Sequence, residues 1–413
     1  MCSRQTGMGM SLVIPIESSE ADAVTATGLH PRKIAERLAA DFAQTAIERD
    51  RKGGTAKRER DLLRQSGLLS LLVPKELGGN ESDWPEILGI VRTFARVDGS
   101  LAHLFGFQHL LLATIELFGS SEQRNFYFQE TARNRWFWGN ALNPLDLSTH
   151  IIKAGDRYVI NGRKGFCSGA TDSDHLVISA WDPLQSKLIV GVIPSNRPGL
   201  RIKQDWDNFG QRQTDSGTVE FADLVLREEE ILRSPGPLGS IRASLRPCVA
   251  QLILSNIYLG LAEGALVEAR NYTLAQTRPW ITSGVASPSE DPHILTNYGN
   301  MYLELQAARA LADRAADTLQ RTWEMGESIS ENYRGRAALD IATAKATTTR
   351  TSLDITNRMF EVMGSRATTG AARLDRFWRN VRTHTLHDPV DYKIRELGDW
   401  ILNRKIPKPT FYS

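Results

Sequence analysis

Hydrophobic residues follow a helical period through the first third of the chain. Apolar side chains recur every three or four positions from Ile34 to Phe42 and again from Ile87 to Val97, as they do on the buried face of a helix. The segment from Leu101 to Phe118 is apolar on almost every side, which predicts a buried helix with Ser100 as its N-cap and Gly119 at its end. We therefore expect this part of the chain to form a helical domain.

The pattern changes near Ser148, where short runs rich in β-branched residues begin. The runs are separated by Gly, Pro, Asp and Asn, and Asn161-Gly162 has the composition of a tight turn. They cover residues 150–153, 158–160, 175–181, 188–194, 200–206 and 218–226. Strands at this spacing predict a small antiparallel barrel or sandwich, and they do not fit alternating βαβ units.

A helical period returns near Leu238 and continues almost to the end of the sequence. Long segments at residues 245–277, 292–325, 330–363 and 377–402 carry it. Long helices with short connections favour an antiparallel bundle. The connection from Arg278 to Asp291 is unusually long, as lids often are, and Pro407 and Pro409 prevent the last residues from continuing a helix.

These three zones predict three domains in a mostly α-helical protein of the α+β class. We expect an N-terminal helical domain at residues 1–140, a middle antiparallel β-domain at residues 141–237, and a C-terminal four-helix bundle with a tail at residues 238–413. The total of 413 residues agrees with two or three domains of about 150 residues each.

Composition and charge narrow the class of partner. The chain has 41% hydrophobic and 24% charged residues, as globular proteins do, and 50 Lys and Arg against 48 Asp and Glu leave a net charge of +2. So small a charge provides no electrostatic surface for nucleic acid or an anionic membrane. No apolar segment has the length of a membrane span, and the apolar run Leu12 to Ile16 is too short for a signal peptide. Three Cys without a CxxC spacing argue against disulfides and zinc, so we expect a cytoplasmic protein that acts on a small molecule.

Several widespread motifs are absent from the sequence. It has no GxGxxG after a strand, no Walker loop, no HExxH and no GxSxG, which argues against a Rossmann dehydrogenase, an ATPase and an α/β-hydrolase. Three other phrases stand out: NGRKGFCSG from Asn161, FGQRQTDSG from Phe209 and MFEVMGSR from Met359. Together with the helical–β–helical order, these phrases resemble the acyl-CoA dehydrogenase superfamily.

Longer phrases resemble one branch of that superfamily, the flavin-dependent monooxygenases of the dibenzothiophene monooxygenase type. They are SGLLSLLVP from Ser66, DGSLAHLFG from Asp98 and FWRNVRTHTLHDP from Phe377, and the resemblance extends from about Ala35 to Ser413. It implies an acyl-CoA dehydrogenase-like fold and an FMNH2-dependent enzyme that uses O2. Through a C4a-hydroperoxyflavin, such an enzyme oxidises the sulfur of an organosulfur compound, which here is a thiophene, a sulfide, or a small sulfinate or sulfone.

The resemblance also implies the partners of the enzyme. A separate NAD(P)H-dependent flavin reductase supplies reduced FMN by diffusion, which agrees with the absence of a nicotinamide motif in this chain. FMN is favoured over FAD as the cofactor. The subunits are expected to form a homotetramer, because bundle faces pack on each other in this fold. The expected role is in sulfur metabolism, as in desulfurization, with no nucleic acid or membrane partner.

The matched phrases carry the candidate site residues. The resemblance implies a catalytic role for His387 as hydrogen-bond donor or acid, and for His103, His384, Ser168 and Asn140. It implies flavin binding by Asn140, Phe166, Ser168, Trp206 and His387, with Arg278 and Arg366 near the phosphate. It implies a substrate pocket lined by Phe107, Phe166, Trp206 and Phe411.

Each of these residues also has a structural interpretation. A histidine on an apolar helix, such as His103, is often only a satisfied core residue, and Arg278 fits a cation that caps a helix end. His384 and His387 have a spacing that suits a metal together with Asp388, but a third His or Cys at helical spacing is missing, so we expect no metal.

Two departures from the family pattern concern the substrate. Phe107 stands where the family has a tyrosine, and LNPLD at residues 142–146 replaces its Ser-Ser-Glu-Asn-Asn. Three alternatives stay open: an FAD-dependent acyl-CoA dehydrogenase with Asp388 as its base, an oxygenase acting on carbon or nitrogen, and a flavin-storing protein without activity. Asp388 is one methylene shorter than the glutamate of such a dehydrogenase, and a displacement of about 1 Å in a base costs much of the rate.

Overall fold

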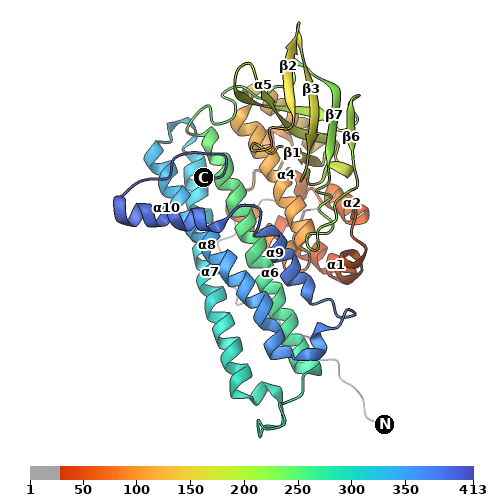
Figure 1. Cartoon of the computed structure of the whole chain (residues 1–413), viewed down its shortest axis with the longest axis vertical. Coiled ribbons are helices and arrows are strands. Elements are labelled where there is room, and N and C mark those ends of the chain that lie inside the picture. Colours follow the sequence, from red (N-terminus) through yellow and green to blue (C-terminus); the bar gives the residue numbers. More distant parts are fainter. Residues whose placement is uncertain (1–27) are drawn as a thin grey trace.

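The computed structural model of the chain describes residues 28–413. The apolar run Leu12 to Ile16 and the start of the expected N-terminal domain lie outside the described residues. Within the described part, helices, a sheet and long bundle helices follow one another in the order that the sequence predicts. Figure 1 shows the sheet at one end of the molecule and the long bundle helices extending to the other end.

The helices that precede the sheet pack closely together. They are α1 (Pro31–Lys52), α2 (Lys57–Gln65), α3 (Trp84–Ala95), α4 (Gly99–Phe118) and α5 (Ser121–Asn134). The N-cap of α4 is Asp98 and not Ser100, because the Asp98 carboxylate accepts hydrogen bonds from the backbone N–H groups of Ser100 and Leu101. Gly119 follows the last residue of α4, as the sequence predicts.

The strands of the described region form one mixed sheet. They are β1 (Trp138–Ala141), β2 (His150–Ala154), β3 (Arg157–Lys164), β4 (His175–Asp182), β5 (Lys187–Pro194), β6 (Leu200–Ile202) and β7 (Val219–Leu226). Their order is β1-β4-β2-β3-β7-β6, with β5 paired to β4. Most pairs are antiparallel as expected, but β1 runs parallel to β4, and β2 also meets β4 in parallel. β1 is too short to show an alternating pattern, so the sequence did not reveal it.

Asn161-Gly162 is not a turn, contrary to the sequence prediction. The turn lies at Gly155-Asp156, and both Asn161 and Gly162 are inside β3, where the register with β7 shifts. Gly162 has φ +128°, and a Cβ atom there would lie 2.3 Å from the carbonyl oxygen of Ser148. The glycine is therefore required by a bulge and a close backbone approach.

Long helices form the C-terminal bundle. They are α6 (Arg246–Gln276), α7 (Pro292–Glu324) and α8 (Glu331–Met363), followed by the shorter α9 (Asp375–His384) and α10 (Val390–Asn403). The sequence pattern predicted a single helix over residues 377–402, and this was wrong. The chain leaves the helix after His384 because Pro389 lacks an N–H group and its ring would clash with a helical backbone. This break places His387 and Asp388 in a loop.

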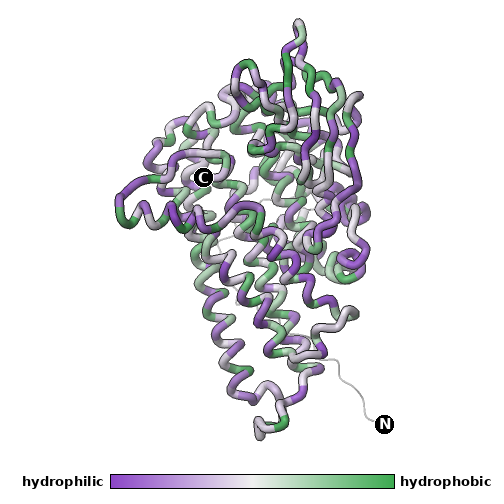
Figure 2. Tube along the Cα trace, viewed as in Figure 1, coloured by the Kyte–Doolittle hydropathy of each residue, from purple (hydrophilic) through white to green (hydrophobic). Residues whose placement is uncertain are grey.

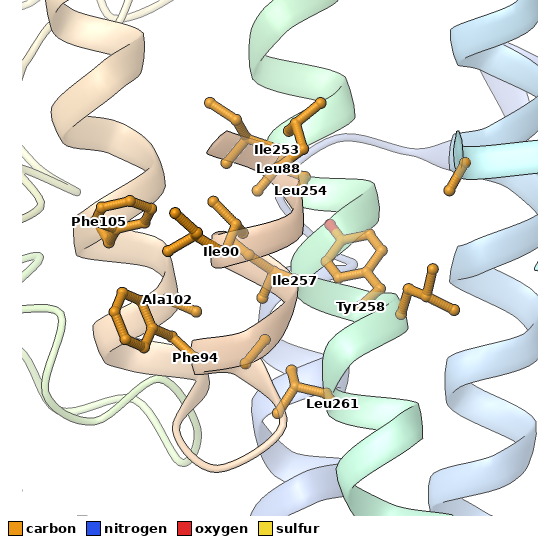
Figure 3. Packing of buried hydrophobic residues seen from close by; sticks show 14 of the residues in the cluster. Leu88, Ile90, Phe94, Ala102, Phe105, Ile253, Leu254, Ile257, Tyr258 and Leu261 are labelled. Carbon is orange, nitrogen blue, oxygen red and sulfur yellow. The ribbon is translucent and has the colours of Figure 1, made fainter. Parts of the chain in front are cut away.

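One hydrophobic core joins the N-terminal helices to the bundle. Figure 3 shows Leu88, Ile90 and Phe94 of α3 packed with side chains of α4 and α6, among them Phe105 and Ile257. Figure 2 shows hydrophilic and hydrophobic residues alternating along the bundle helices. Two helical segments, residues 99–118 and 243–276, have the length and composition of membrane spans, but 94% and 89% of their most apolar windows lie buried inside the fold. They are core helices here.

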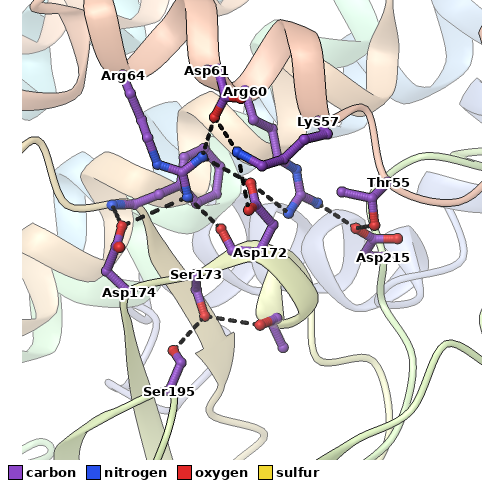
Figure 4. A network of polar contacts seen from close by, with 12 residues as sticks. Thr55, Lys57, Arg60, Asp61, Arg64, Asp172, Ser173, Asp174, Ser195 and Asp215 are labelled. Carbon is purple, nitrogen blue, oxygen red and sulfur yellow. Dashed lines mark hydrogen bonds and ion pairs between the residues drawn. The ribbon is translucent and has the colours of Figure 1, made fainter.

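Buried ion pairs attach the loops of the sheet domain to α2 (Figure 4). Arg60, which is fully buried, donates from Nη2 to the Asp215 carboxylate at 2.7 Å, and Arg64 donates from Nη1 to Asp172 at 2.8 Å. Thr55 also donates to Asp215 at 2.7 Å. The bonds to Asp215 hold the loop before β7 against the helical domain, and the bond to Asp172 holds the turn before β4. The loop before β7 carries part of the candidate site.

Candidate active site

Two buried histidines meet between α4 and α9. His103 Nδ1 lies 2.9 Å from His384 Nε2, and the His103 ring stacks on Phe107 with 3.9 Å between ring centroids. Burial lowers the pKa of His103 to about 3 and holds the pKa of His384 well below its ordinary value, with nearby His387 adding to both shifts. Both rings are therefore neutral, and the structure brings together three residues that the sequence predicted for the site.

His387 lies next to this pair in the loop between α9 and α10. Its ring is partly exposed, and its Nδ1 lies 3.0 Å from Oδ1 of Asp388. Burial would raise the pKa of Asp388, but the hydrogen bond with His387 and the ammonium group of Lys345 outweigh it and keep that pKa below its usual value. Asp388 is therefore an ionised partner of His387, and the other imidazole nitrogen of His387 is left for a ligand.

Asn140 and Ser168, two further candidates from the sequence, lie next to each other. The backbone N–H of Asn140 donates to the carbonyl of Ser168 at 2.9 Å, and the Asn140 side-chain oxygen accepts from the backbone of Leu142. The Ser168 hydroxyl lies 2.8 Å from that of Ser216, which lies 2.7 Å from the hydroxyl of Thr214. The Asn140 amide NH2 has no protein partner in the described part of the chain, so it is available to an acceptor on a ligand.

Phe166 and Trp206 form an aromatic corner beside Ser168. Their ring centroids lie 5.9 Å apart, and Trp206 donates from Nε1 to the carbonyl of Gln211 at 2.8 Å. Phe166 is 67% exposed and has φ +58°, which is rare for a residue with a Cβ atom. A large apolar ring held at the surface in this conformation suits contact with a flat ligand.

The loop from Trp206 to Ser216 connects the aromatic corner to the histidines. Gln211 donates its backbone N–H to the Asn380 side chain of α9 at 2.7 Å, and Gln213 donates to the Ser100 hydroxyl of α4 at 3.2 Å. At Gly210 a Cβ atom would lie 2.0 Å from the carbonyl oxygen of Arg379, so only glycine permits this approach to α9.

Arg278 and Arg366 lie far from the histidines of their own chain. Both are exposed at the same end of the bundle, where Thr277 donates to the carbonyl of Met363 at 3.1 Å. Tyr258, which donates to the backbone of His384 at 2.9 Å, is separated from the end of α6 by a rise of about 27 Å at about 1.5 Å per residue. A single chain does not bring these arginines to the histidine pair, and their role in phosphate binding stays a prediction.

The C-terminal tail reaches the site through Tyr412. Its ring centroid lies 6.1 Å from that of His387, whereas Phe411, which the sequence placed in the substrate pocket, is half-buried without a described contact to the histidines. The role of Phe411 stays a prediction. Sequence reasoning missed Tyr412, and it also missed Lys345, Gln251 and Ser216, although Ser216 lies within a quoted phrase.

The two histidines of α9 and the following loop have different partners. His384 faces His103, while His387 faces Asp388. Within residues 28–413 no group of three or more His, Cys, Asp and Glu side chains is arranged to hold a metal ion.

Comparisons with known proteins agree with the fold. Residues 31–135, 140–224 and 252–392 match the N-terminal, middle and C-terminal domains of acyl-CoA dehydrogenases. The chain is 52% identical over 382 residues to "Probable FMNH2-dependent monooxygenase SfnC" of Pseudomonas putida, covering 92% of this chain and 96% of that protein. It is 44% identical over 398 residues to dibenzothiophene monooxygenase of Mycolicibacterium goodii, covering 93% and 96%.

Two solved structures are similar over nearly their whole length. Methanesulfinate monooxygenase MsuC from Pseudomonas fluorescens has a TM-score of 0.92 and 51% identity, covering 93% of this chain and 100% of that one. FMN-bound TdsC from Paenibacillus sp. A11-2 has a TM-score of 0.89 and 42% identity, covering 92% and 99%. The chain therefore belongs to the acyl-CoA dehydrogenase superfamily, in its branch of flavin-dependent monooxygenases. The resemblance inferred from the sequence is confirmed, and so is the fold class.

Proposed function

We propose that this chain is the oxygenase component of a two-component flavin-dependent monooxygenase, which uses FMNH2 and O2 to oxidise the sulfur of an organosulfur compound. The observation that carries the proposal is the full-length similarity, at 42–52% identity, to proteins named as FMNH2-dependent, methanesulfinate and dibenzothiophene monooxygenases. The site described above has the chemistry that this function needs.

The residues of the site fit FMN, which is the cofactor of this enzyme. The Asn140 amide, the Ser168 hydroxyl and the buried, unpartnered Nε2 of His103 offer polar groups, and Phe166 with Trp206 offers an aromatic wall. When bound, reduced FMN supplies the electrons with which O2 is activated. We assign Asn140, Ser168, His103, Phe166 and Trp206 to the flavin.

Neutral histidines suit oxygen chemistry for a physical reason. His103 and His384 are both held uncharged, so they form hydrogen bonds without acting as strong proton donors. A buried environment of neutral, weakly acidic groups excludes water. It thereby suppresses early proton transfer to the reacting oxygen. His387, which is closer to solvent, is the group that we assign to donate a proton to the reacting oxygen.

The site fits the function of an acyl-CoA dehydrogenase less well than that of a monooxygenase. The base of such a dehydrogenase would have to be Asp388, which is 8% exposed. Both oxygens of Asp388 are engaged, Oδ1 with His387 at 3.0 Å and Oδ2 with Gln251 at 3.2 Å. A carboxylate whose pKa is lowered by these partners is a poor base for a carbon acid.

We propose a small sulfinate as the first substrate class to test, because a sulfinate sulfur carries a lone pair that can accept an oxygen atom, whereas a sulfone sulfur carries none. The support is the higher identity to SfnC and to the methanesulfinate monooxygenase, 52% and 51%, than to the dibenzothiophene monooxygenase of M. goodii, 44%. Phe107, which stacks on His103, and the segment 142–146 that follows β1 are the departures most relevant to substrate choice.

The dependence on FMNH2 implies that a flavin reductase supplies the reduced flavin. We further propose a cytoplasmic homotetramer in which Arg278 and Arg366 approach the flavin phosphate of another subunit. The support is their exposure at the bundle end, far from the histidines of their own chain.

The test is an isotope experiment. Anaerobic protein loaded with FMNH2 is mixed with 18O2 and with methanesulfinate or dibenzothiophene, and the products are analysed by mass spectrometry. One 18O atom on sulfur per oxidation step is expected. Products labelled at carbon or nitrogen, or anaerobic bleaching of oxidised flavin by an acyl-CoA, would overturn the proposal.

A further inference from the structure

Lys345 is a fully buried lysine that the function described above does not use. It is on α8 and is 1% exposed. Its Nζ lies 3.5 Å from Oδ1 of Asp388 and donates to the hydroxyl of Tyr258 at 3.2 Å. Tyr258 in turn donates to the carbonyl of His384, at the end of α9. Lys345 therefore connects α8 and α6 to the segment that carries the site.

Asp388 Oδ1 accepts hydrogen bonds from Lys345 on one side and from His387 on the other. Since a carboxylate only accepts hydrogen bonds, His387 must present a protonated Nδ1 to it, and this leaves Nε2 as the nitrogen that faces a ligand. Gln251 binds the second carboxylate oxygen at 3.2 Å and fixes its orientation. The arrangement sets both the tautomer and the direction of the His387 ring.

The two buried charges act on His387 with opposite sign. The Asp388 carboxylate stabilises a protonated imidazole, and the Lys345 ammonium opposes this stabilisation at short range. Burial lowers the pKa of Lys345 to about 8 although Asp388 raises it, so the lysine is largely protonated at neutral pH. The other titratable groups that face His387 are His384 on α9, His103 on α4 and Tyr412 of the tail. Both of those histidines are neutral.

We propose that Lys345 and Asp388 are positioning residues that together set the tautomer and the proton affinity of His387. Asp388 orients the ring and stabilises its protonated form, and Lys345 on the other side of the same carboxylate oxygen opposes that stabilisation. The significance of the pair for catalysis rests on the proposed role of His387, whereas its effect on the His387 titration does not.

The test is a pair of isosteric substitutions with opposite expected effects. In the full-length protein without flavin, NMR of 13C-labelled histidine follows the His387 titration, with the signal assigned by its loss in His387→Gln. Lys345→Met is expected to raise the titration midpoint by on the order of one pH unit, and Asp388→Asn to lower it by on the order of one pH unit. Two shifts of the same sign, or no shift, would overturn the proposal.

Removal of both charges provides a second variant in case one single variant does not fold. Lys345→Met combined with Asp388→Asn leaves no uncompensated buried charge. Its midpoint is expected to lie between those of the single variants. If the double variant keeps a midpoint equal to that of either single variant, the two residues do not act in opposition and the proposal fails.

Lys393→Met is the matched control. Lys393 is also a buried lysine, 6% exposed, but it pairs with Glu396 on α10 at 3.1 Å. This variant is expected to leave the His387 midpoint in place, and a shift as large as that of Lys345→Met would show that any buried charge in this region has the same effect.

The pH profile of sulfur oxidation distinguishes the effect of Lys345 and Asp388 on His387 from the proposed role of His387 in catalysis. It is expected to move in the same direction as the NMR midpoint in each variant. If the NMR midpoints move as stated while the oxidation profile does not, Lys345 and Asp388 still position His387, and the proposed role of His387 as proton donor is wrong.

Discussion

His103 Nδ1 and His384 Nε2 lie 2.9 Å apart, although the two residues are 281 positions apart in the sequence. Each ring keeps a second nitrogen, Nε2 of His103 and Nδ1 of His384, that is buried and has no protein partner in the described residues. Two neutral imidazoles share one hydrogen bond, and the pair offers further polar atoms to a ligand. This pair is the buried centre of the candidate site.

We expect His103→Ala to weaken flavin binding as well as the fold. The substitution leaves the His384 ring without its partner, which costs about 1–3 kcal/mol of unfolding free energy. It also removes a polar group assigned to FMN, so the dissociation constant of FMN, measured by fluorescence quenching, is expected to rise at least several-fold.

His109→Ala is the control for this prediction. His109 is buried on the same helix, but its Nε2 lies 3.1 Å from the carbonyl of Leu68, away from the site. Its loss is expected to lower stability without changing FMN affinity. Equal effects of the two substitutions on FMN binding would contradict the assignment of His103.

The buried neutral histidines make the fold sensitive to acid. Burial lowers the pKa of His103 and of His109 to about 3, against about 6.5 in an unfolded chain. Between these values the unfolded chain holds protons that the folded chain does not, so the free energy of unfolding falls as the pH falls from about 6.5 to 3. The slope is at most about 1.4 kcal/mol per pH unit for each histidine.

Urea unfolding at several pH values checks this prediction. His109→Gln is expected to reduce the slope of the free energy of unfolding against pH between pH 4 and pH 6. The reduction is at most the contribution of one proton, because the substitution removes one group that is protonated only in the unfolded chain. An unchanged slope would mean that the folded protein protonates His109 in this range.

Ser216→Ala is expected to disturb the flavin side of the site with little effect on stability. The Ser216 hydroxyl bridges Ser168 and Thr214, and without it the Ser168 hydroxyl loses its partner. A loss of about 1 kcal/mol in stability and a weaker binding of FMN are expected. Ser195→Ala, which breaks a similar 2.7 Å hydroxyl pair with Ser173, should leave FMN binding unchanged.

Arg278→Ala and Arg366→Ala are expected to affect FMN but not riboflavin. Both side chains are exposed, so stability should change by less than about 0.5 kcal/mol. If the guanidinium groups bind the phosphate, the affinity for FMN falls while that for riboflavin, which lacks the phosphate, stays the same. Arg157→Ala, at the exposed start of β3, is the control. A parallel loss for both flavins would contradict the phosphate assignment.

Much of the fold follows from local patterns in the sequence, and the site follows only in part. The 3.6-residue period predicted the long helices, but the period alone does not show the break after His384. Pro389 was the signal in the sequence that could have placed His387 in a loop. The histidine pair was found through matched phrases. Lys345 has no such phrase, and its significance depends on packing against Asp388, 43 residues away, which a single sequence does not reveal.

The shared core of α3, α4 and α6 has a consequence for protein engineering. A fragment that stops at residue 140 would leave the apolar side chains of α3 and α4 in water, and such a fragment is expected to aggregate. Chimeras between relatives should therefore take the N-terminal helices and α6 from the same parent, and avoid a single junction in the sheet region, because such a junction would divide this core between two parents.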